Sequence, residues 1–390
     1  MKRIFDFCKK EVVLCIACIL AIASMFFILP DKEYLGYPDY RVLALLFCLM
    51  AIMEGFKQTG LFGQLAYALL KRVQNFRQLF LVLVLLCFFC SMWITNDVAL
   101  ITFVPFSLLV LKLAGLKRQM VPVIVMQTVA ANLGSMLTPL GNPQNLYLYS
   151  LSGSGFGEFV YTMAPLTSLS LILITAVCFI HKNEPISKDV IQQMIPERGC
   201  EDDCNHDKQQ NAVLAVLFAL SLLSVARILS WQILLGITIV VCIFISCIWK
   251  RELLLKKVDY NLLLTFIAFF VFIGNMGRIE AVGKFISEIV SGHELIIAFA
   301  CSQVISNVPA TILLSGFTIE YEKLLMGVNI GGLGTLIASL ASLISYKLYA
   351  EECCNDDEYN SKSRYIGNFT LVNVLFAVIL LGAAFIMQQT

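Results

Sequence analysis

The chain has 390 residues, 59% of them hydrophobic and only 14% charged, with a formal net charge of +1 and a mean hydropathy of +0.82. Soluble domains have about a quarter of their residues charged, and nucleic-acid-binding domains gather basic residues on one face. The composition therefore excludes a soluble globular domain and indicates an all-α polytopic membrane protein. It gives no reason to expect nucleic acid as a partner.

Apolar runs bounded by polar or charged residues recur along the whole chain, and runs of this length predict membrane-spanning helices. The first run, 12–29, follows four basic residues and is either a signal peptide or an uncleaved anchor; its length favours the anchor. Two apolar stretches, 78–113 and 295–318, are each interrupted by a polar motif. The predicted spans are 12–29, 41–56, 121–150, 162–180, 211–229, 231–249, 260–277, 327–349 and 365–386.

The flanking charges predict the side of the membrane on which each interrupted stretch opens. The basic residues near the N-terminus place that end in the cytoplasm. Basic residues on both sides of 78–113 place both its flanks there, so this stretch is either two full spans or a re-entrant hairpin that opens inward. Acidic residues flank 295–318, which predicts a hairpin that opens outward.

The two interrupted stretches also resemble each other. At an offset of 211 residues, "CSMWITNDVALITFVPF" (90–106) and "CSQVISNVPATILLSGF" (301–317) are identical at seven of 17 positions. At an offset of 197, "NLG" with Thr138 corresponds to "NIG" with Thr335. Two repeats of opposite orientation are typical of secondary transporters. We expect a first repeat over 1–186, a cytoplasmic loop over 187–210 and a second repeat over 211–390.

Each repeat contains a span that should be broken. Gly134, Pro139, Gly141 and Pro143 interrupt 121–150, which predicts a helix, a loop and a second helix. The counterpart, 327–349, has glycines but no proline, and a milder break is expected there. Non-helical backbone inside a membrane persists where it is buried in protein or lines a cavity. The hairpin tips and the two breaks together therefore predict a transport site.

The hairpin tips carry residues suited to small ions. Their oxygens can replace the water shell of a cation, and the N–H groups of half-helices can bind an anion. Asp97, the carboxylate at a tip, either belongs to an ion or proton path or caps the following half-helix. We expect cation binding or coupling at Ser91, Thr95, Asn96, Asp97, Gly134, Ser302, Ser306, Asn307 and Gly331, and substrate binding at Asn96, Asn307, Thr138, Asn142 and Gly332.

Other polar residues have plainer explanations. Cys200, Cys204 and His206 match no standard zinc pattern, so a solvated loop is expected there. Arg278 should anchor at the membrane interface or attract anions into an outward vestibule. The sequence has no nucleotide-binding or nucleophile motif, so we expect neither a cofactor nor enzyme activity.

The motifs "TNDVALITFVP", "LTPLGNPQN" and "SQVISNVPATILL", in this order, resemble those of the ion transporter superfamily. This group of citrate-transporter-like permeases includes arsenite permeases, NhaD-type sodium/proton antiporters and divalent anion/sodium symporters, and the chain is similar to its YbiR-type inner-membrane permeases. The resemblance implies inverted repeats, a scaffold domain that forms a homodimer in the lipid, and a transport domain that moves in an elevator-like stroke. It also implies a small anionic substrate, a coupling cation (Na⁺ or H⁺) and a multi-pass protein of the bacterial inner (plasma) membrane.

The same resemblance suggests roles for single residues. In the symporters each tip carries Ser-Asn-Thr; Thr95-Asn96 and Ser306-Asn307 match the first two positions, and the breaks at Gly134 and Gly331 would complete two cation sites. Asp97 and Val308 stand where the two threonines would hold a substrate carboxylate. The expected function is secondary active transport of an anion or small oxyacid, coupled to sodium or protons. The alternatives are NhaD-type sodium/proton antiport and arsenite-like efflux.

Overall fold

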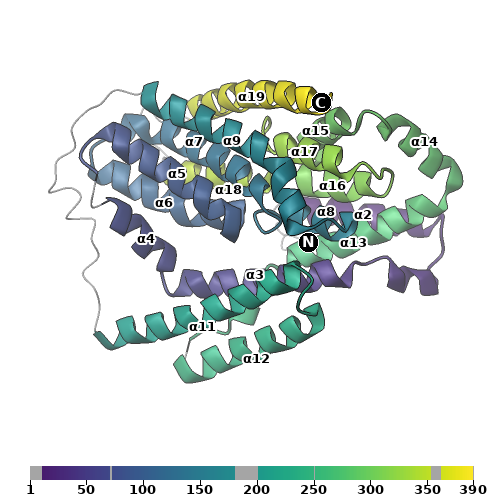
Figure 1. The fold of residues 1–390 in the computed structure, drawn as a ribbon, viewed down its shortest axis with the longest axis horizontal. Coiled ribbons are helices and arrows are strands. Elements are labelled where there is room, and N and C mark those ends of the chain that lie inside the picture. The colour runs from purple at the N-terminus through teal and green to yellow at the C-terminus, as the bar shows by residue number, and fades with distance from the viewer. Residues whose placement is uncertain (1–10, 71–72, 181–200, 250, 353–361, 390) are drawn as a thin grey trace, which may run out of the picture.

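The computed structural model describes residues 11–70, 73–180, 201–249, 251–352 and 362–389, without the side chains of 201–205. These residues form helices joined by loops (Figure 1). Eight helices are long and apolar enough to cross a membrane, and two bent pairs of helices raise that number to ten if each pair is one span. The all-helical, multi-pass membrane fold predicted from the composition is confirmed.

Long apolar helices alternate with short helices along the chain. The first half contains α2 (Val12–Met25), η1 (Lys32–Gly36), α3 (Tyr40–Gln58), α4 (Leu61–Leu70), α5 (Phe76–Ile94), α6 (Asn96–Leu113), η2 (Lys117–Gln119), α7 (Met120–Gly134), η3 (Ser135–Leu137), α8 (Pro143–Ser152) and α9 (Phe156–Ile180). The second half contains α11 (Glu201–Val225), α12 (Trp231–Trp249), η4 (Leu254–Lys257), α13 (Tyr260–Arg278), α14 (Glu280–Val290), α15 (Glu294–Ile305), α16 (Asn307–Ser315), α17 (Tyr321–Gly331), α18 (Leu340–Glu352) and α19 (Lys362–Met387).

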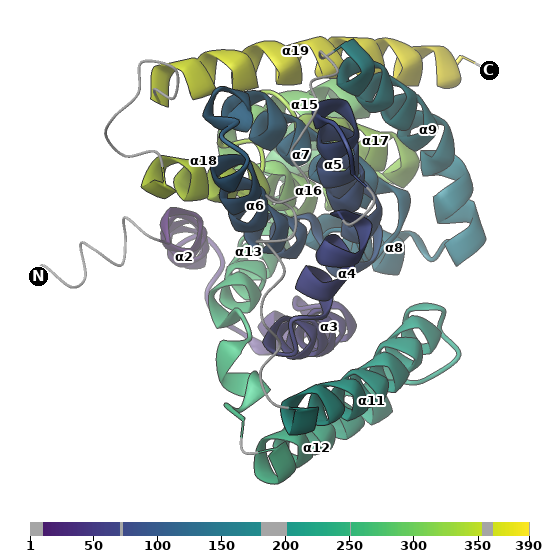
Figure 2. The same ribbon diagram turned by 90° about the vertical axis from the view of Figure 1, so that its left-hand side faces the viewer.

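Five helices form a group at one side of the molecule. α11 and α12 pack on α3 and lie beyond it, away from the other helices (Figure 2). α2 packs on α13, where the Nδ2 of Asn275 donates to the Oγ of Ser24 over 2.8 Å. Because both polar side chains are buried in apolar surroundings, this hydrogen bond satisfies groups that would be costly to leave unpaired.

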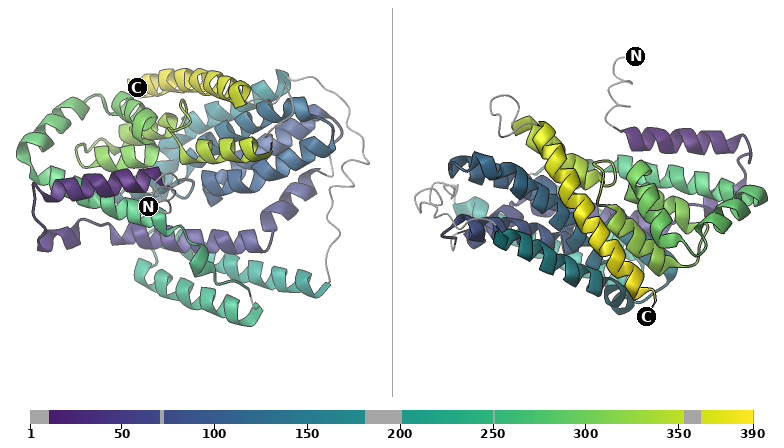
Figure 3. Two further views of the ribbon diagram at one scale, coloured as in Figure 1. Left: turned by 180° about the vertical axis from the view of Figure 1, so that it is seen from behind. Right: turned by 90° about the horizontal axis from the view of Figure 1, so that it is seen from above.

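The remaining long helices form a second group, in which helices of one repeat pack against helices of the other. α5 packs on α7 and α15 packs on α17, so the first arm of each hairpin lies beside the first half of its own broken helix. α6 packs on α18 and α16 packs on α8, so each second arm lies against the other repeat. Two repeats related by a pseudo-twofold axis produce this pattern. In Figure 1 the first hairpin occupies the left half of the view and the second the right half, and α19 crosses over α7 and α9 (Figure 3).

The helix boundaries keep both offsets found in the sequence. α5 and α15 end at Ile94 and Ile305, which are 211 residues apart, and α7 and α17 end at Gly134 and Gly331, which are 197 apart. The expectation of a milder second break was wrong. Eight residues, 332–339, separate α17 from α18 and contain no helical turn, whereas η3 lies within the equivalent residues 135–142. This break contains no proline, and within it Gly334 has a φ of +108° that residues with a side chain rarely adopt.

Two short helices, α4 and α14, were not predicted, because neither is long and apolar enough to be read as a span. Each precedes a hairpin: α4 is bent by 56° from α3, and α14 by 109° from α15. α9 and α11 begin earlier than expected, at Phe156 and Glu201 instead of 162 and 211. Part of the stretch expected to be a cytoplasmic loop is thus helical.

Candidate functional site

The two hairpin tips share an unusual backbone conformation. Thr95 has φ 63° and ψ 147°, and Ser306 has φ 74° and ψ 154°. Side chains make this region unfavourable, at a cost of about 1–3 kcal/mol for each residue. Among the described non-glycine residues, only Arg227 also has a positive φ. Because the same unfavourable backbone conformation recurs at equivalent positions of the two repeats, we infer that contacts around each tip maintain it.

Each tip is bonded to the helix break of its own repeat. The N–H of Asn96 donates to the carbonyl of Gly141 over 3.1 Å, and the N–H of Asn307 donates to that of Ala338 over 2.9 Å. In both tips the asparagine Oδ1 accepts the next N–H, from Asp97 or Val308, over 2.9 Å. The side-chain amide thereby satisfies one of the N–H groups left unpaired at the start of a half-helix.

The serine of each hairpin lies against a glycine of the broken helix. A Cβ on Gly134 would lie 2.1 Å from the carbonyl oxygen of Phe88 and 2.8 Å from the Oγ of Ser91. A Cβ on Gly331 would lie 2.6 Å from the Oγ of Ser302. These glycines let the helices approach closely. Both serine hydroxyls donate to a carbonyl one turn earlier, which leaves their oxygens as acceptors at the contact.

A second pair of equivalent bonds ties the breaks to the hairpins. The hydroxyl of Thr138 donates to the carbonyl of Met92, and that of Thr335 donates to the carbonyl of Gln303 over 3.1 Å. Thr138 therefore holds the first hairpin in place. Gly332 lies beside the second tip, where a Cβ would come within 3.1 Å of the Nδ2 of Asn307.

One buried amide joins the first tip to the helix break that holds the second tip. The Oδ1 of Asn132 accepts hydrogen bonds from the Nδ2 of Asn96 over 2.9 Å and from the Oγ of Ser339 over 3.1 Å. Ser339 directly follows Ala338, whose carbonyl binds Asn307. Asn96 and Asn307 are each only 4% exposed. The first tip is thus enclosed by protein, and the two helices that it joins, α5 and α6, are each long and apolar enough to cross a membrane.

Polar residues that the sequence analysis did not select extend this cluster. The Nδ2 of Asn145 donates to the carbonyls of Ser135 and Thr138, both over 3.1 Å, and its Oδ1 accepts from Asn329 over 2.8 Å. Asn142, which the sequence analysis did select, donates to the Oγ of Ser135 in the same cluster over 2.7 Å. Amides in an otherwise apolar span were the available signal for Asn145 and Asn329.

The charge of the cluster is unusual for an anion site. The stretches 88–107, 127–150, 298–317 and 325–345 contain no lysine, arginine or histidine, and Asp97 is their one carboxylate. Asp97 is half-buried, and its carboxylate has no hydrogen-bond partner among the described residues. Amides, hydroxyls and backbone dipoles must therefore supply the recognition of any cargo held here.

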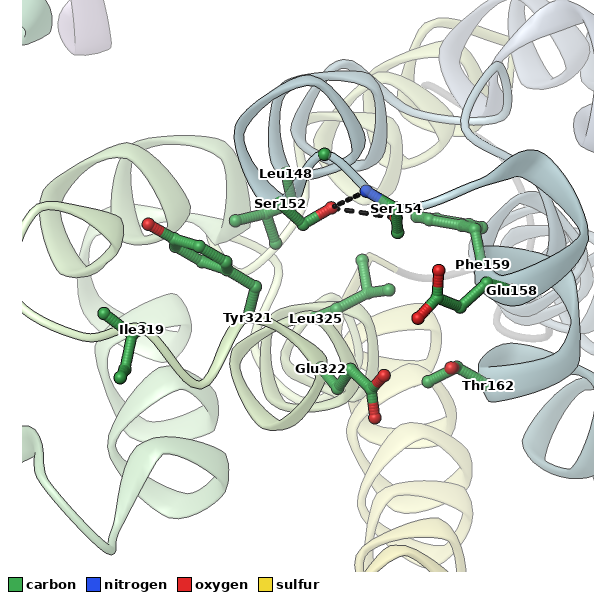
Figure 4. Close-up of a pocket in the computed structure, with 11 residues that line it drawn as sticks. Leu148, Ser152, Ser154, Glu158, Phe159, Thr162, Ile319, Tyr321, Glu322 and Leu325 are labelled. Atoms are coloured by element: carbon green, nitrogen blue, oxygen red, sulfur yellow. Dashed lines mark hydrogen bonds between the residues drawn. The ribbon is translucent and has the colours of Figure 1, made fainter. Parts of the chain in front are cut away.

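A pocket of about 350 Å³ lies between α8, α9 and α17, at the end of the cluster that the flanking charges predict to face outside (Figure 4). Glu158 and Glu322 line it with Leu148 and Leu325. One turn along α8 and α17 from these leucines lie Asn145 and Asn329. The two leucines thus stand between the pocket and the hydrogen bond that joins the repeats.

Two further sequence predictions can be placed. Arg278 pairs with Asp31 at 2.7 Å and with Glu33 at 3.3 Å, so its charge is neutralised and not available to attract anions. The hydrogen bond from Arg278 lowers the pKa of Asp31. Cys200 and the side chain of Cys204 lie outside the described residues. Within the described part of the chain, no group of three or more His, Cys, Asp or Glu could hold a metal ion.

Inverted repeats, paired hairpins and a buried polar cluster between many membrane helices define a membrane transport protein. A model of the citrate transporter family (CitMHS) matches residues 5–341, and the chain belongs to this family. It is accordingly a transporter and not an enzyme.

Relatives named as transporters or membrane proteins agree with that assignment. An uncharacterised transporter of Methanocaldococcus jannaschii, MJ0456, is 33% identical over 325 residues, which cover 82% of this chain and 84% of the relative. The inner membrane protein YbiR of Escherichia coli is 30% identical over 331 residues, covering 83% and 84%. The rice silicon efflux transporter LSI3 is 28% identical over 161 residues, covering 40% of this chain and 33% of the relative.

Proposed function

We propose that the protein is a secondary active transporter that carries a small anion or oxyacid between the two hairpin tips, coupled to a cation. The observation that carries this proposal is the junction at Asn132, which bonds the strained first tip to Ser339, the residue after the carbonyl that binds the second tip. A site shared by two repeats of opposite orientation can be reached from either side by movement of one body against another.

The helix groups suggest which bodies move. α3, α11, α12, α13 and α2 pack mainly with one another, while both hairpins and both broken helices form the second group. α4 and α14 are the bent links that lead from α3 and α13 into the two hairpins. We propose that the hairpin group moves against the α3 group as a unit and carries the cargo with it, since the hydrogen bonds between tips and breaks lie within that group.

The chemistry of the cluster favours a small oxyacid over a polycarboxylate. A citrate-like cargo with several full charges would need cationic side chains or more donors than the amides of Asn96 and Asn307 provide. Val308 offers no hydroxyl, and the negative charge of Asp97 opposes a second one nearby. A small acid with O–H groups can donate as well as accept. The name of the rice relative, a silicon efflux transporter, is consistent with such a cargo.

A sodium/proton antiporter is the second candidate, and Asp97 is the observation that favours it. A carboxylate in a site without cationic side chains can bind a metal cation or a proton in turn. The two functions differ in one measurement. A cotransporter accumulates its oxyacid against a gradient, whereas an antiporter moves sodium when a pH gradient is imposed without any oxyacid present.

The test is counterflow in liposomes with purified protein, using silicic acid, arsenite, phosphate and citrate under imposed sodium or proton gradients. For the cargo that shows saturable exchange, we expect Asn96→Ala and Asn307→Ala each to weaken binding by about tenfold to a hundredfold. Each removes a hydrogen bond worth about 1.5–3 kcal/mol if the cargo is charged. Asn368→Ala is the matched control, because that amide only bonds back to Arg364 on the exposed face of α19.

Val308→Thr adds the hydroxyl that the second tip lacks and should leave carboxylate binding unchanged or stronger. If both alanine variants bind the cargo as tightly as the wild type, the site lies elsewhere and the proposal is wrong. Exchange of sodium for protons without transport of silicic acid, arsenite, phosphate or citrate would favour the antiporter.

A further inference from the structure

Arg227 occupies a position where the end of a helix favours glycine. α11 ends at Val225, and the N–H of Arg227 then donates to the carbonyl of Ser224 over 3.1 Å. The N–H of Ile228 donates to the carbonyl of Leu223 over 2.9 Å. These two bonds form a Schellman motif, which places the second residue after the helix in the left-handed region, and Arg227 has a φ of 64°. A residue with a side chain is disfavoured in that conformation.

Glycine fills the equivalent position at the ends of α3, α6 and α14. Gly60, Gly115 and Gly292 each lie two residues beyond the last helical residue and have φ values between 65° and 79°. An arginine at this position costs the folded state free energy that a glycine would not cost. A favourable contact of the Arg227 side chain is therefore expected.

The guanidinium of Arg227 lies at the C-terminal end of α8. Its Nη1 donates to the carbonyl of Gly153 over 3.1 Å, and its Nη2 lies 3.4 Å from the carbonyl oxygen of Ser150 and 3.5 Å from that of Tyr149. Its Cζ is also 5.9 Å from the centre of the Tyr149 ring. The last carbonyls of a helix lack intrahelical partners and carry partial negative charge, so a cation is stabilised there.

These contacts connect the two groups of helices. Arg227 belongs to the turn between α11 and α12, in the α3 group, whereas α8 is the second half of a broken helix in the hairpin group. A second bond crosses at the same place, where the hydroxyl of Ser150 donates to the carboxylate of Asp39 at the start of α3 over 3.3 Å. Arg41 of α3 donates to the carbonyl of Ser224 over 3.2 Å, which holds the turn that carries Arg227 against α3.

The proposed movement of the hairpin group against the α3 group has to break these bonds. Arg227 is exposed, and hydrogen bonds that compete with water contribute little enough to break and form again. Resting on the transport function proposed above, we infer that Arg227 is a latch between the two groups. It holds the hairpin group in the position found in this structure and releases α8 when that group moves. Ser150 and Asp39 form a second, weaker part of the latch.

The test measures how long the hairpin group stays in this position. Tyr161 of α9 and Ile248 of α12, two exposed residues in different groups, are replaced with an azide-bearing amino acid and coupled to fluorescent dyes. Energy transfer between the dyes is followed in single full-length molecules in liposomes. We expect two levels of transfer, and Arg227→Gly should shorten the dwell time in the level that corresponds to the structure by about threefold to tenfold.

Three further variants separate a latch from a purely structural contact. Arg227→Ala removes the guanidinium but keeps the strained backbone, so it should shorten the dwell time equally and melt at a lower temperature than Arg227→Gly. Ser150→Ala should shorten the dwell time by a smaller factor. Arg251→Ala is the matched control, because this arginine donates to the carbonyl of Gln58 over 3.2 Å and pairs with Asp207, both within the α3 group. It should leave the dwell time unchanged even if the melting temperature falls.

A dwell time that Arg227→Gly does not shorten, or that Arg251→Ala shortens equally, would overturn the inference. Arg227→Gly is expected to fold, since glycine suits the backbone at this position. Counterflow of silicic acid, arsenite, phosphate and citrate keeps the two proposals apart. Absence of saturable exchange would overturn the transport function, whereas exchange by a protein with a single level of energy transfer would overturn the latch alone.

Discussion

Asn96 and Asn132 are joined by a hydrogen bond of 2.9 Å between the Nδ2 of the first and the Oδ1 of the second. Since the same Oδ1 also accepts from Ser339 of the second repeat, one amide oxygen connects the first hairpin tip to both broken helices. The proposed movement of the cargo site as a unit requires a connection of this kind, because separate tips would lose their relative geometry during such a movement.

Asn132→Ala should therefore impair stability and transport together. The change leaves the buried Nδ2 of Asn96 and the hydroxyl of Ser339 without this acceptor, at a cost of about 1–3 kcal/mol for an unsatisfied buried group. We expect a lower melting temperature in detergent and a strongly reduced rate of counterflow. Asn373→Ala is the control, because that buried amide bonds only within α19. Equal rates of counterflow in the two variants would show that transport does not depend on the hydrogen bonds of Asn132.

Asp97→Asn tests whether the carboxylate takes part in coupling. The amide keeps the size and one acceptor oxygen but cannot ionise, so gradient-driven uptake should be abolished while exchange of the cargo continues. Uptake is measured under sodium and proton gradients at several pH values, with the melting temperature as the check on folding. A variant with wild-type dependence on sodium and pH would reduce Asp97 to a helix cap.

Gly134→Ala should be more harmful than Gly331→Ala. The added methyl group at 134 would lie 2.1 Å from a backbone carbonyl oxygen, which can move only if α5 and α7 separate, whereas at 331 the nearest atom, at 2.6 Å, is a serine hydroxyl. Overpacking of this kind costs about 1–3 kcal/mol, and more when backbone must shift.

Gly236→Ala in α12 is the matched control for both substitutions, since a Cβ there meets no atom within 4 Å. Helix propensity predicts a gain of up to about 1 kcal/mol at this position. The melting temperatures of the three variants should rank Gly236→Ala above Gly331→Ala above Gly134→Ala. A Gly134→Ala variant that does not melt lowest would contradict the close approach of α5 and α7.

The pair of Asp31 and Arg278 predicts a pH-dependent contribution to stability. Because this pair lowers the pKa of Asp31 in the folded protein, its contribution is fully present above about pH 4, the ordinary value for an aspartate, and is lost as the pH falls through the lower folded-state value. Asp31→Asn should melt slightly below the wild type at pH 7, and the difference should vanish in acid. The control is Glu288→Gln on the exposed face of α14. A gap between the two melting temperatures that stays constant as the pH falls below 4 would refute this explanation.

Local sequence was sufficient to locate the features that depend on neighbours in the chain. Apolar runs identified the long helices, and the glycines at 134 and 331 marked where two of them end. Both signals are local, because a glycine affects the backbone conformation only of the helical turn that contains it. In the sequence, the offsets of 211 and 197 already pair Asn96 with Asn307 and Gly134 with Gly331. The short helices α4 and α14 were not predicted, because their length and charge match neither a span nor a loop.

Only the tertiary structure decided which of these pieces touch. Asn132 was recognised as part of a repeated motif, but its bond to Ser339 crosses from one repeat to the other and follows from the packing of α7 beside α18. Arg227 was unremarkable in the sequence, since its guanidinium matters only where the carbonyls of Ser150 and Gly153 lie beside it. Hydrogen bonds between residues far apart in the chain depend on how whole helices pack, and no local pattern of residues determines that packing.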